Sequence, residues 1–478
     1  MKICKDREIC FNGDYIYNDV LINVIAEHQT LVPNLQRLEN YYKGDQDIKN
    51  RTKSNSYCSN SKGVFNLAKN IADTSHSYVF ANPVIYETDN EELINNFTLI
   101  GEDSHNNEMG LDMCIFGRAY ELLYGDLADD GVTPIINLKN LSPLNTFVVY
   151  DNDIKQSPLF AVYYYPVYDL EGELLKYKVL VYTDNFIFNY EAKDLESDYS
   201  LIGEEPHLFK GVPILEVNNN RYAHGDFEGV IDILDAYNLL QNDRINSKQQ
   251  LVDALLVVSG ISFGDTDAEA SAEIKRLFDE KVLELPENSR AEFISNSLNE
   301  AEVEILRKSL LDDIHKISKI PNMSDENFAN NQSGVSLSYK LLGFEQLSKQ
   351  KELKFIDLLR RRLRLMNNVL SLKGKGFDVN EISIKMYRTL PVNLDDKLKE
   401  LQGTDGTLSL RTRLTRYDSE LDVDRELQLI EEEKSNNAQM MASAYGDYNF
   451  KANQQLDKLT AEDIREYNKD EEEEQPTK

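Results

Sequence analysis

The stretch "DFEGVIDILDAYNLLQNDRINSKQQLVDALLVVSG", from Asp226 to Gly260, contains no proline and no glycine between Gly229 and Gly260. It predicts one helix of roughly 32 residues, about 48 Å long. Both ends carry apolar residues at helical spacing, whereas the middle, Gln241–Gln250, is almost wholly polar. Such a helix is either flanked by copies of itself or plainly exposed to solvent, and the sequence leaves both interpretations open.

Two further long helices are expected after this stretch. From Asn299 to Ile320, apolar residues recur at spacings of three and four, and Pro321 ends the pattern. A third long helix runs from Gly334 to a break at Gly374. The loop between these two helices is rich in asparagine, serine and aspartate, which predicts a hinge. A small module with one helix and two strands, "KVLELP" and "AEFIS", precedes Asn299.

The N-terminal half predicts helices followed by a β-rich part. One helix starts at Asn18, is interrupted near Pro33 and is closed by Gly44. Further helices are expected at Val64–Val79, in "NEELINNF" and in "NNEMGLDMCIFG", the last turning into strand near Gly117. Segments rich in Val, Tyr, Phe and Ile between positions 134 and 217 predict antiparallel strands. The fold class is therefore α+β, with one strand and two helices expected after Thr389.

The chain has 478 residues, 83 acidic and 52 basic, and a formal charge of −31. This acidity argues against tight wrapping of nucleic acid, because that affinity comes from Lys and Arg at phosphates. It suits a surface that DNA slides past, although solubility alone explains it as well. The four cysteines form no CxxC pair, and neither a signal peptide nor a membrane span is predicted. We therefore expect an intracellular protein with reduced thiols and no membrane contact.

Motifs for nucleotide, metal or nucleophile chemistry are lacking. The sequence has no GxxxxGK[ST] loop and no HExxH pair, and its six histidines are scattered. "GISFG" at 260–264 matches GxSxG, but a helix precedes it where a hydrolase needs a strand. We therefore expect no enzyme, no cofactor and no metal site. In "RRRLRL", Arg360, Arg361 and Arg364 lie near one helical face and suit either DNA or acidic groups of the protein.

Five stretches, in this order, resemble the portal proteins of tailed bacteriophages, in particular the SPP1-type portal family. Together they span most of the chain, and one departure is Ser336, where the family has another small residue after "SGV". They are "NLAKNIADTSHSYVFANPV", "CIFGRAYELLYGD", "LSPLNTFVVYDND", "IPNMSDENFANNQSGVSLSYKLLGFEQLSKQKELKF" and "SLRTRLTRYDSELDVDRELQLIEEE".

The resemblance implies a phage portal fold assembled as a ring, with long stem helices, a β-rich wing, a small α/β clip and a helical crown. Its parts are listed here by residue number: wing 1–225, first stem helix 226–260, clip 261–298, second stem helix 299–320, tunnel loop 321–335, long wing helix and following strand 336–390, crown 391–465, and a disordered acidic tail 466–478.

The resemblance also implies a function: a head–tail connector at a capsid vertex, which acts in DNA packaging and ejection. The implied partners are eleven further copies in a dodecameric ring, double-stranded DNA, the terminase large subunit, a head-completion adaptor, and major capsid and scaffolding proteins. The expected location is the virion, after assembly in the host cytoplasm. The alternatives are another virion component, such as a minor capsid or adaptor protein, and a DNA-processing enzyme.

The resemblance places three sets of candidate residues. Those of the tunnel loop are Asn322, Ser324, Asp325, Glu326, Asn327, Asn330, Asn331, Gln332, Ser333 and Gly334. Those lining the channel from the stem are Gln241, Arg244, Lys248, Lys308 and Lys316. Those binding partners at the clip are Asp265, Asp267, Glu269, Glu287 and Asn288.

Overall fold

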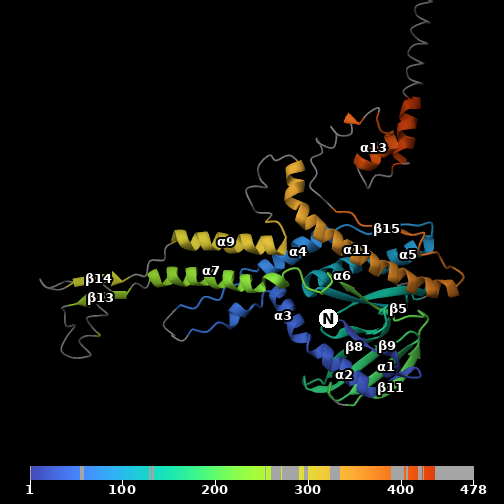
Figure 1. Ribbon diagram of the computed structural model, residues 1–478, viewed down its shortest axis with the longest axis horizontal. Coiled ribbons are helices and arrows are strands. Elements are labelled where there is room, and N and C mark those ends of the chain that lie inside the picture. Colours follow the sequence, from blue (N-terminus) through green and yellow to red (C-terminus); the bar gives the residue numbers. More distant parts are fainter. Residues whose placement is uncertain are drawn as a thin grey trace, which may run out of the picture. The chain divides into compact units, whose positions relative to one another are not determined.

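The computed structural model divides the chain into two compact units, Met1–Thr389 and Leu390–Lys478, and Figure 1 traces both. The residues it describes are 2–53, 59–128, 131, 134–196, 198–252, 255–259, 271, 290–294, 300–322, 334–388, 403–404, 407–417, 423 and 425–436.

Helices open the first unit, largely where the sequence predicts them. Pro33 lies in the first turn of α3, where a missing N–H costs nothing, and Gly44 ends that helix at φ 81°. The predicted break near Pro33 is therefore confirmed. The helices are α1 (Arg7–Cys10), α2 (Asn18–Gln29), α3 (Val32–Lys43), the 3₁₀ turn η1 (Asp47–Asn50), α4 (Leu67–Phe80), α5 (Glu91–Ile100) and α6 (Glu102–Phe116).

A six-stranded sheet forms the β-rich part, in the order β1-β7-β8-β9-β10-β11. Strands β7 to β11 pair antiparallel, which confirms the prediction for β7 to β10, whereas β1 joins the edge parallel to β7. The sequence analysis did not predict β1 or β11. The strands are β1 (Ile3–Lys5), β7 (Thr146–Asp151), β8 (Pro158–Tyr168), β9 (Leu174–Tyr182), β10 (Phe186–Ala192) and β11 (Ser200–Pro206).

A three-stranded antiparallel sheet, β12-β5-β6, connects the helices to the larger sheet. Gly117 joins α6 to β5 at φ 73°, and a Cβ there would lie 2.2 Å from the Ala223 carbonyl oxygen. Only glycine therefore lets α6 pack this closely against the 223–225 turn. The strands are β5 (Arg118–Leu127), β6 (Pro134–Leu141) and β12 (Ile214–Asn218), and the short pairs are β2 (Phe11–Asn12) with β3 (Tyr15–Ile16) and β4 (Ile85–Glu87) with β15 (Ser383–Lys385).

The third long helix, α11 (Gly334–Leu372), closes the main core, and Gly374 follows it at φ 73°. Its apolar side chains pack among those of α3, α4, α6 and β5. Figure 1 shows this helix passing beside α4. Phe355, Leu358 and Leu363 are fully buried there. The predicted helix and its break at Gly374 are confirmed.

The long helix predicted within Asp226–Gly260 is confirmed at its N-terminal end and wrong at its C-terminal end. A 3₁₀ turn, η2 (Glu228–Val230), leads into α7 (Ile231–Val252), and β13 (Leu255–Ser259) follows, paired with β14 (Arg290–Ile294). The run Leu-Leu-Val-Val favours strand once a partner strand is available. The predicted strand "AEFIS" is thus confirmed, and "KVLELP" lies outside the described residues.

The helix predicted at Asn299–Ile320 is α9 (Glu300–Ser318), close to its predicted bounds, and it lies beside α7 in Figure 1. In the second unit, α13 (Leu410–Tyr417) and a helix at 425–436 confirm the two predicted helices. The strand expected directly after Thr389 lies outside the described residues, as do the acidic tail and the predicted clip, 261–298, except for 271 and 290–294.

Candidate functional site

Ion pairs connect α7 and α9, the two helices that are predicted to form the stem. Arg244 of α7 contacts Glu300 at 3.2 Å and Glu304 at 3.0 Å, and Lys248 contacts Glu300 at 2.6 Å. These side chains are 33–59% exposed, so water and salt weaken each pair. The pairs set the register of the two helices more than they stabilise them.

The candidates for channel lining fall into two groups. Gln241 donates to the Tyr237 hydroxyl at 3.2 Å, and Arg244 and Lys248 are engaged with α9. Lys308 and Lys316 are exposed on α9. The structure thus pairs Arg244 and Lys248 with acidic groups of the same chain. A channel-lining role stays a prediction for all five residues.

The polar middle of α7 binds an extended segment of its own chain. Asn238, Asn242 and Asn246 are buried, and their side-chain oxygens accept the backbone N–H groups of Phe65, Gly63 and Ser61 at 2.9, 2.7 and 2.7 Å. Four helical residues rise about 6 Å, which matches two residues of extended chain at about 6.6 Å.

This asparagine ladder (Asn238, Asn242 and Asn246) accounts for part of the polar middle of α7. Flanking copies of the chain are therefore not the whole explanation of that polar stretch. A further bond runs from the Asn242 amide to the Gly63 carbonyl at 2.7 Å. One face of α7 is therefore satisfied within the chain, because unpaired backbone groups of 61–65 would otherwise be buried. Leu239 and Ile245, on other faces, remain 43% and 37% exposed.

A buried ion pair anchors α11 to the segment that precedes η2 and α7. The Lys351 ammonium contacts the Asp226 carboxylate, which precedes η2, and donates to Ser75 Oγ at 2.5 Å. Burial lowers the pKa of Lys351, but the Asp226 charge outweighs it and the pKa is raised. Burial also raises the pKa of the neighbouring Cys114 thiol, which keeps it protonated.

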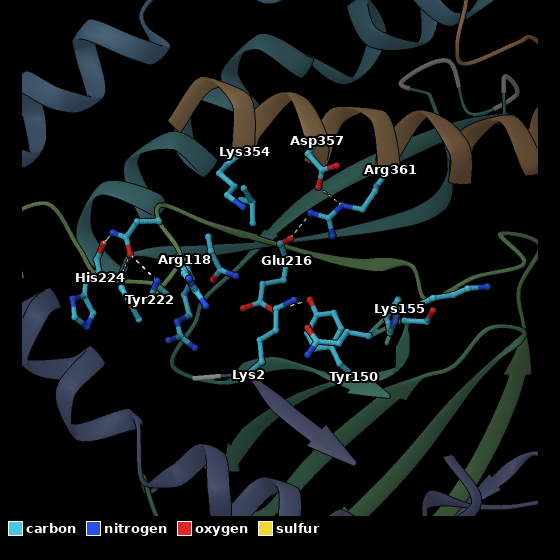
Figure 2. Close-up of a pocket in the computed structure, with 18 residues that line it drawn as sticks. Lys2, Arg118, Tyr150, Lys155, Glu216, Tyr222, His224, Lys354, Asp357 and Arg361 are labelled. Carbon is cyan, nitrogen blue, oxygen red and sulfur yellow. Dashed lines mark hydrogen bonds and ion pairs between the residues drawn. The ribbon is translucent and has the colours of Figure 1, made fainter. Parts of the chain in front are cut away.

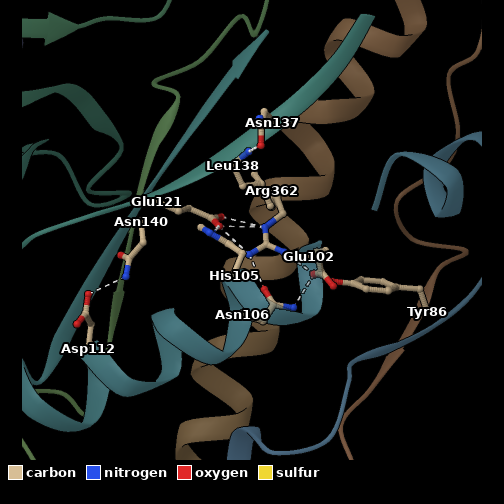
Figure 3. A network of polar contacts seen from close by, with 10 residues as sticks. All are labelled: Tyr86, Glu102, His105, Asn106, Asp112, Glu121, Asn137, Leu138, Asn140 and Arg362. Atoms are coloured by element: carbon tan, nitrogen blue, oxygen red, sulfur yellow. Dashed lines mark hydrogen bonds and ion pairs between the residues drawn. The ribbon is translucent and has the colours of Figure 1, made fainter. Parts of the chain in front are cut away.

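A second buried cluster surrounds Arg362 of α11, as Figure 3 shows. Its guanidinium contacts Glu121 of β5 at 2.7 Å and Glu102 of α6 at 2.6 Å. It also donates to the side-chain oxygen of Asn106 at 2.8 Å. All of these side chains are buried. The cluster therefore joins α11, α6 and β5 through one side chain.

The Glu121 carboxylate of this cluster is held ionised. Burial alone raises the pKa of Glu121, but Arg362 and the hydrogen bond from His105 at 3.0 Å outweigh it and lower the pKa to about 2. Glu102 accepts from the Tyr86 hydroxyl at 2.6 Å, and burial raises the pKa of that tyrosine well above its usual value. These polar groups bind one another, which suits a role in holding α11, α6 and β5 together.

Neither anchor was found from the sequence, although a weak signal exists. Arg362 falls at a core position of the pattern Phe355, Leu358, Leu359, Leu363 and Met366, where a cation must be buried with partners. The sequence analysis singled out Arg360, Arg361 and Arg364 instead. Of these, Arg361 lies 3.3 Å from Asp357 of α11, which confirms acidic pairing for that residue.

The other candidate residues lie mostly outside the described residues. All five clip candidates do, as do those of the tunnel loop apart from Asn322 and the backbone of Gly334, the first residue of α11. Among the described residues, no three His, Cys, Asp or Glu side chains form a group that could hold a metal ion. No described helix is long and apolar enough to cross a membrane.

Two solved structures resemble this chain distantly. The neck of an empty GTA particle, computed with C6 symmetry, gives a TM-score of 0.41 at 12% identity, over 73% of this chain and 89% of that one. The neck of a native GTA particle, computed with C12 symmetry, gives 0.38 at 14% identity, over 73% and 87%. These TM-scores are too low to support an argument about fold or assembly.

Sequence comparison is more informative. The portal protein of Bacillus phage SPP1 is 25% identical over 404 residues, which are 79% of this chain and 77% of that protein. The portal protein of Clostridium phage phiCD119 is 24% identical over 300 residues, 57% and 64% of the two chains. The profile of the family described as "Phage portal protein, SPP1 Gp6-like" matches residues 22–440. This chain belongs to that family of phage portal proteins.

Proposed function

We propose that copies of this chain form a dodecameric ring at a capsid vertex, whose channel passes double-stranded DNA during packaging and ejection. The observation that carries this proposal is the family match over residues 22–440. The location at the virion vertex, after assembly in the host cytoplasm, is part of the same proposal.

The stem pair supports a ring because it leaves apolar side chains uncovered. On α9, Ile305, Leu306 and Ile317 are 69%, 49% and 55% exposed. The apolar stripe predicted for this helix is only partly covered by the chain itself, since Ile314 alone is buried among its members Val303, Leu306, Leu310, Ile314 and Ile317. Covering one such side chain stabilises by about 1.5–3 kcal/mol. A neighbouring copy repeated around a ring would cover each of them.

The charge of the stem suits a passage for DNA. Arg244 and Lys248 face the glutamates of α9, which weakens the attraction of this pair for phosphates. In the proposed ring, Gln241, Lys308 and Lys316 line the channel together with that neutralised pair. DNA would then move along the wall without a strong cationic grip.

The remaining parts are assigned by the family resemblance. The clip, 261–298, would bind the terminase large subunit and later the head-completion adaptor, and the loop 321–335 would border the narrowest part of the channel. The crown, 391–465, would face the capsid interior, where major capsid and scaffolding proteins are the expected partners. No catalytic role is proposed, so ATPase and nuclease assays with magnesium should show no turnover.

Negative-stain microscopy of the purified full chain tests the ring, with native mass spectrometry giving its subunit number. We expect rings with a central hole. The variant Ile305→Asp/Ile317→Asp should lose them, because two carboxylates would enter the contact between copies. Leu170→Asp, at a fully exposed turn between β8 and β9, is the matched control. A uniform monomer at high protein concentration and low salt would contradict the proposal.

A further inference from the structure

A cleft of about 850 Å³ opens in the first unit (Figure 2), and none of its lining residues belongs to α7 or α9. Most of its wall comes from the end of β12, the turn 220–224, the loop 155–158 before β8 and one face of α11, and Lys2, Arg118 and Tyr150 complete it. Clefts of this size hold small molecules or short peptide segments.

The cleft is basic in a strongly acidic chain. Six cations line it, against two carboxylates, those of Glu216 and Asp357. The cations are Lys2, Arg118, Lys155, Arg221, Lys354 and Arg361. Since the whole chain carries a formal charge of −31, this local excess is a departure that solubility does not explain.

The two carboxylates are already engaged inside the cleft. Asp357 lies 3.3 Å from Arg361, whose guanidinium also donates to the Glu216 backbone oxygen at 2.7 Å. The Glu216 carboxylate accepts from the Tyr150 hydroxyl at 2.7 Å, and it helps to raise the pKa of Arg118 although burial opposes this. Two cations are thus compensated within the wall.

The other four cations remain available at the rim. Lys155, Arg221 and Lys354 are exposed, and within the described part of the chain none of the three forms an ion pair. Lys2 lies 4.4 Å from the centre of the Tyr150 ring, a contact that leaves its charge unneutralised. These four come from separate stretches, so they surround the opening instead of following one helix.

The cleft also leaves hydrogen-bonding capacity unused. The Arg118 side chain is 92% buried, and its Nε–H has no hydrogen-bond partner, nor does the Asn218 side-chain oxygen. An unpartnered donor and an unpartnered acceptor in one wall each destabilise the folded chain.

We propose that this cleft binds an acidic peptide segment of a partner protein. Carboxylates of the segment pair with Lys155, Arg221 and Lys354 at the rim, and its backbone approaches the wall formed by Arg118 and Asn218. A recess with two carboxylates inside is poorly suited to the continuous negative charge of a nucleic acid. Charge-assisted contacts of this kind confer specificity and speed association.

Fluorescence anisotropy with the full chain tests this proposal. The probe is a labelled octapeptide of alternating glutamate and glycine, compared with the same peptide carrying glutamine. We expect binding of the glutamate probe, at least tenfold weaker in Lys155→Glu/Lys354→Glu. Lys139→Glu changes one charge at an exposed site outside the cleft and should bind as the unchanged chain does. Microscopy of each variant checks that its assembly is the same.

Several outcomes would overturn the proposal. Equal weakening by Lys139→Glu would show general attraction to charge and no site. Tighter binding of inorganic phosphate or a short single-stranded DNA, with the same dependence on Lys155 and Lys354, would assign the cleft to phosphates. A chain ending at residue 465 that binds the probe much more tightly would show that the acidic terminus of the protein itself competes. Equal binding by the shortened chain supports a separate partner.

Discussion

The stem and the anchors of α11 use the same chemistry in opposite surroundings. Arg244 and Lys248 meet the glutamates of α9 with side chains 33–59% exposed. Arg362 and Lys351 meet their carboxylates with side chains at most 3% exposed. Water and salt screen the first set, whereas in the second set loss of one partner leaves a charge buried.

This contrast indicates different mechanical roles for the buried clusters of α11 and for the exposed pairs between α7 and α9. The buried clusters fix α11 against α6, β5 and the start of the stem, so these parts move together. The exposed pairs of α7 and α9 can break and re-form at small cost, which lets the two stem helices adjust. The asparagine ladder is intermediate, since it is buried but uncharged.

The largest effect is expected from Arg362→Met. It removes the cation between Glu121 and Glu102 and leaves both carboxylates buried, so the free energy of unfolding should fall by about 3–5 kcal/mol. Urea unfolding measures it. Arg360→Met, on an exposed face of the same helix, is the control and should change little. A loss no larger than that of the control would remove the contrast drawn above.

Lowering the pH should reduce the free energy of unfolding through Glu121 of the same cluster. The folded pKa of Glu121 is about 2, below the ordinary 4.5. The ionised carboxylate therefore contributes stability that is complete above about pH 4.5 and is lost as the pH falls towards 2. Unfolding measured from pH 7 to pH 3 should show a smaller decline in Glu121→Gln than in the unchanged chain. Parallel pH profiles would mean that Glu121 titrates normally.

A smaller effect is expected at the asparagine ladder. Asn242→Ala removes the bonds to the Gly63 N–H and carbonyl, each 2.7 Å, at a cost of about 1–3 kcal/mol. Hydrogen exchange should speed up at Gly63 more than in the core of the wing. Asn23→Ala, at an exposed position of α2, is the matched substitution and should leave Gly63 protected.

The smallest effect is expected at the stem pair. A double-mutant cycle of Arg244→Ala and Glu304→Ala should give a coupling that is weak at low salt and absent at about 0.5 M salt. The cycle of Arg362→Met and Glu121→Gln should keep its coupling at both salt concentrations. Equal salt dependence in the two cycles would show that burial does not separate these regions.

Local patterns predicted most helices and strands, because breakers and periodicity act over a few residues. Pro33, Gly44 and Gly374 mark element boundaries in both the sequence and the structure. The end of α7 was missed, because Leu255–Ser259 is apolar at helical as well as strand spacing and only its pairing with β14 decides.

By itself the sequence determined the α+β class, the three long helical segments and, through ordered motifs, the portal family. The tertiary structure alone decided which polar groups meet: Arg362 with Glu121, Lys351 with Asp226, and the ladder with 61–65. The physical reason is distance along the chain. These partners are separated by more than a hundred residues, so no local pattern links them, and only folding brings them together and excludes water.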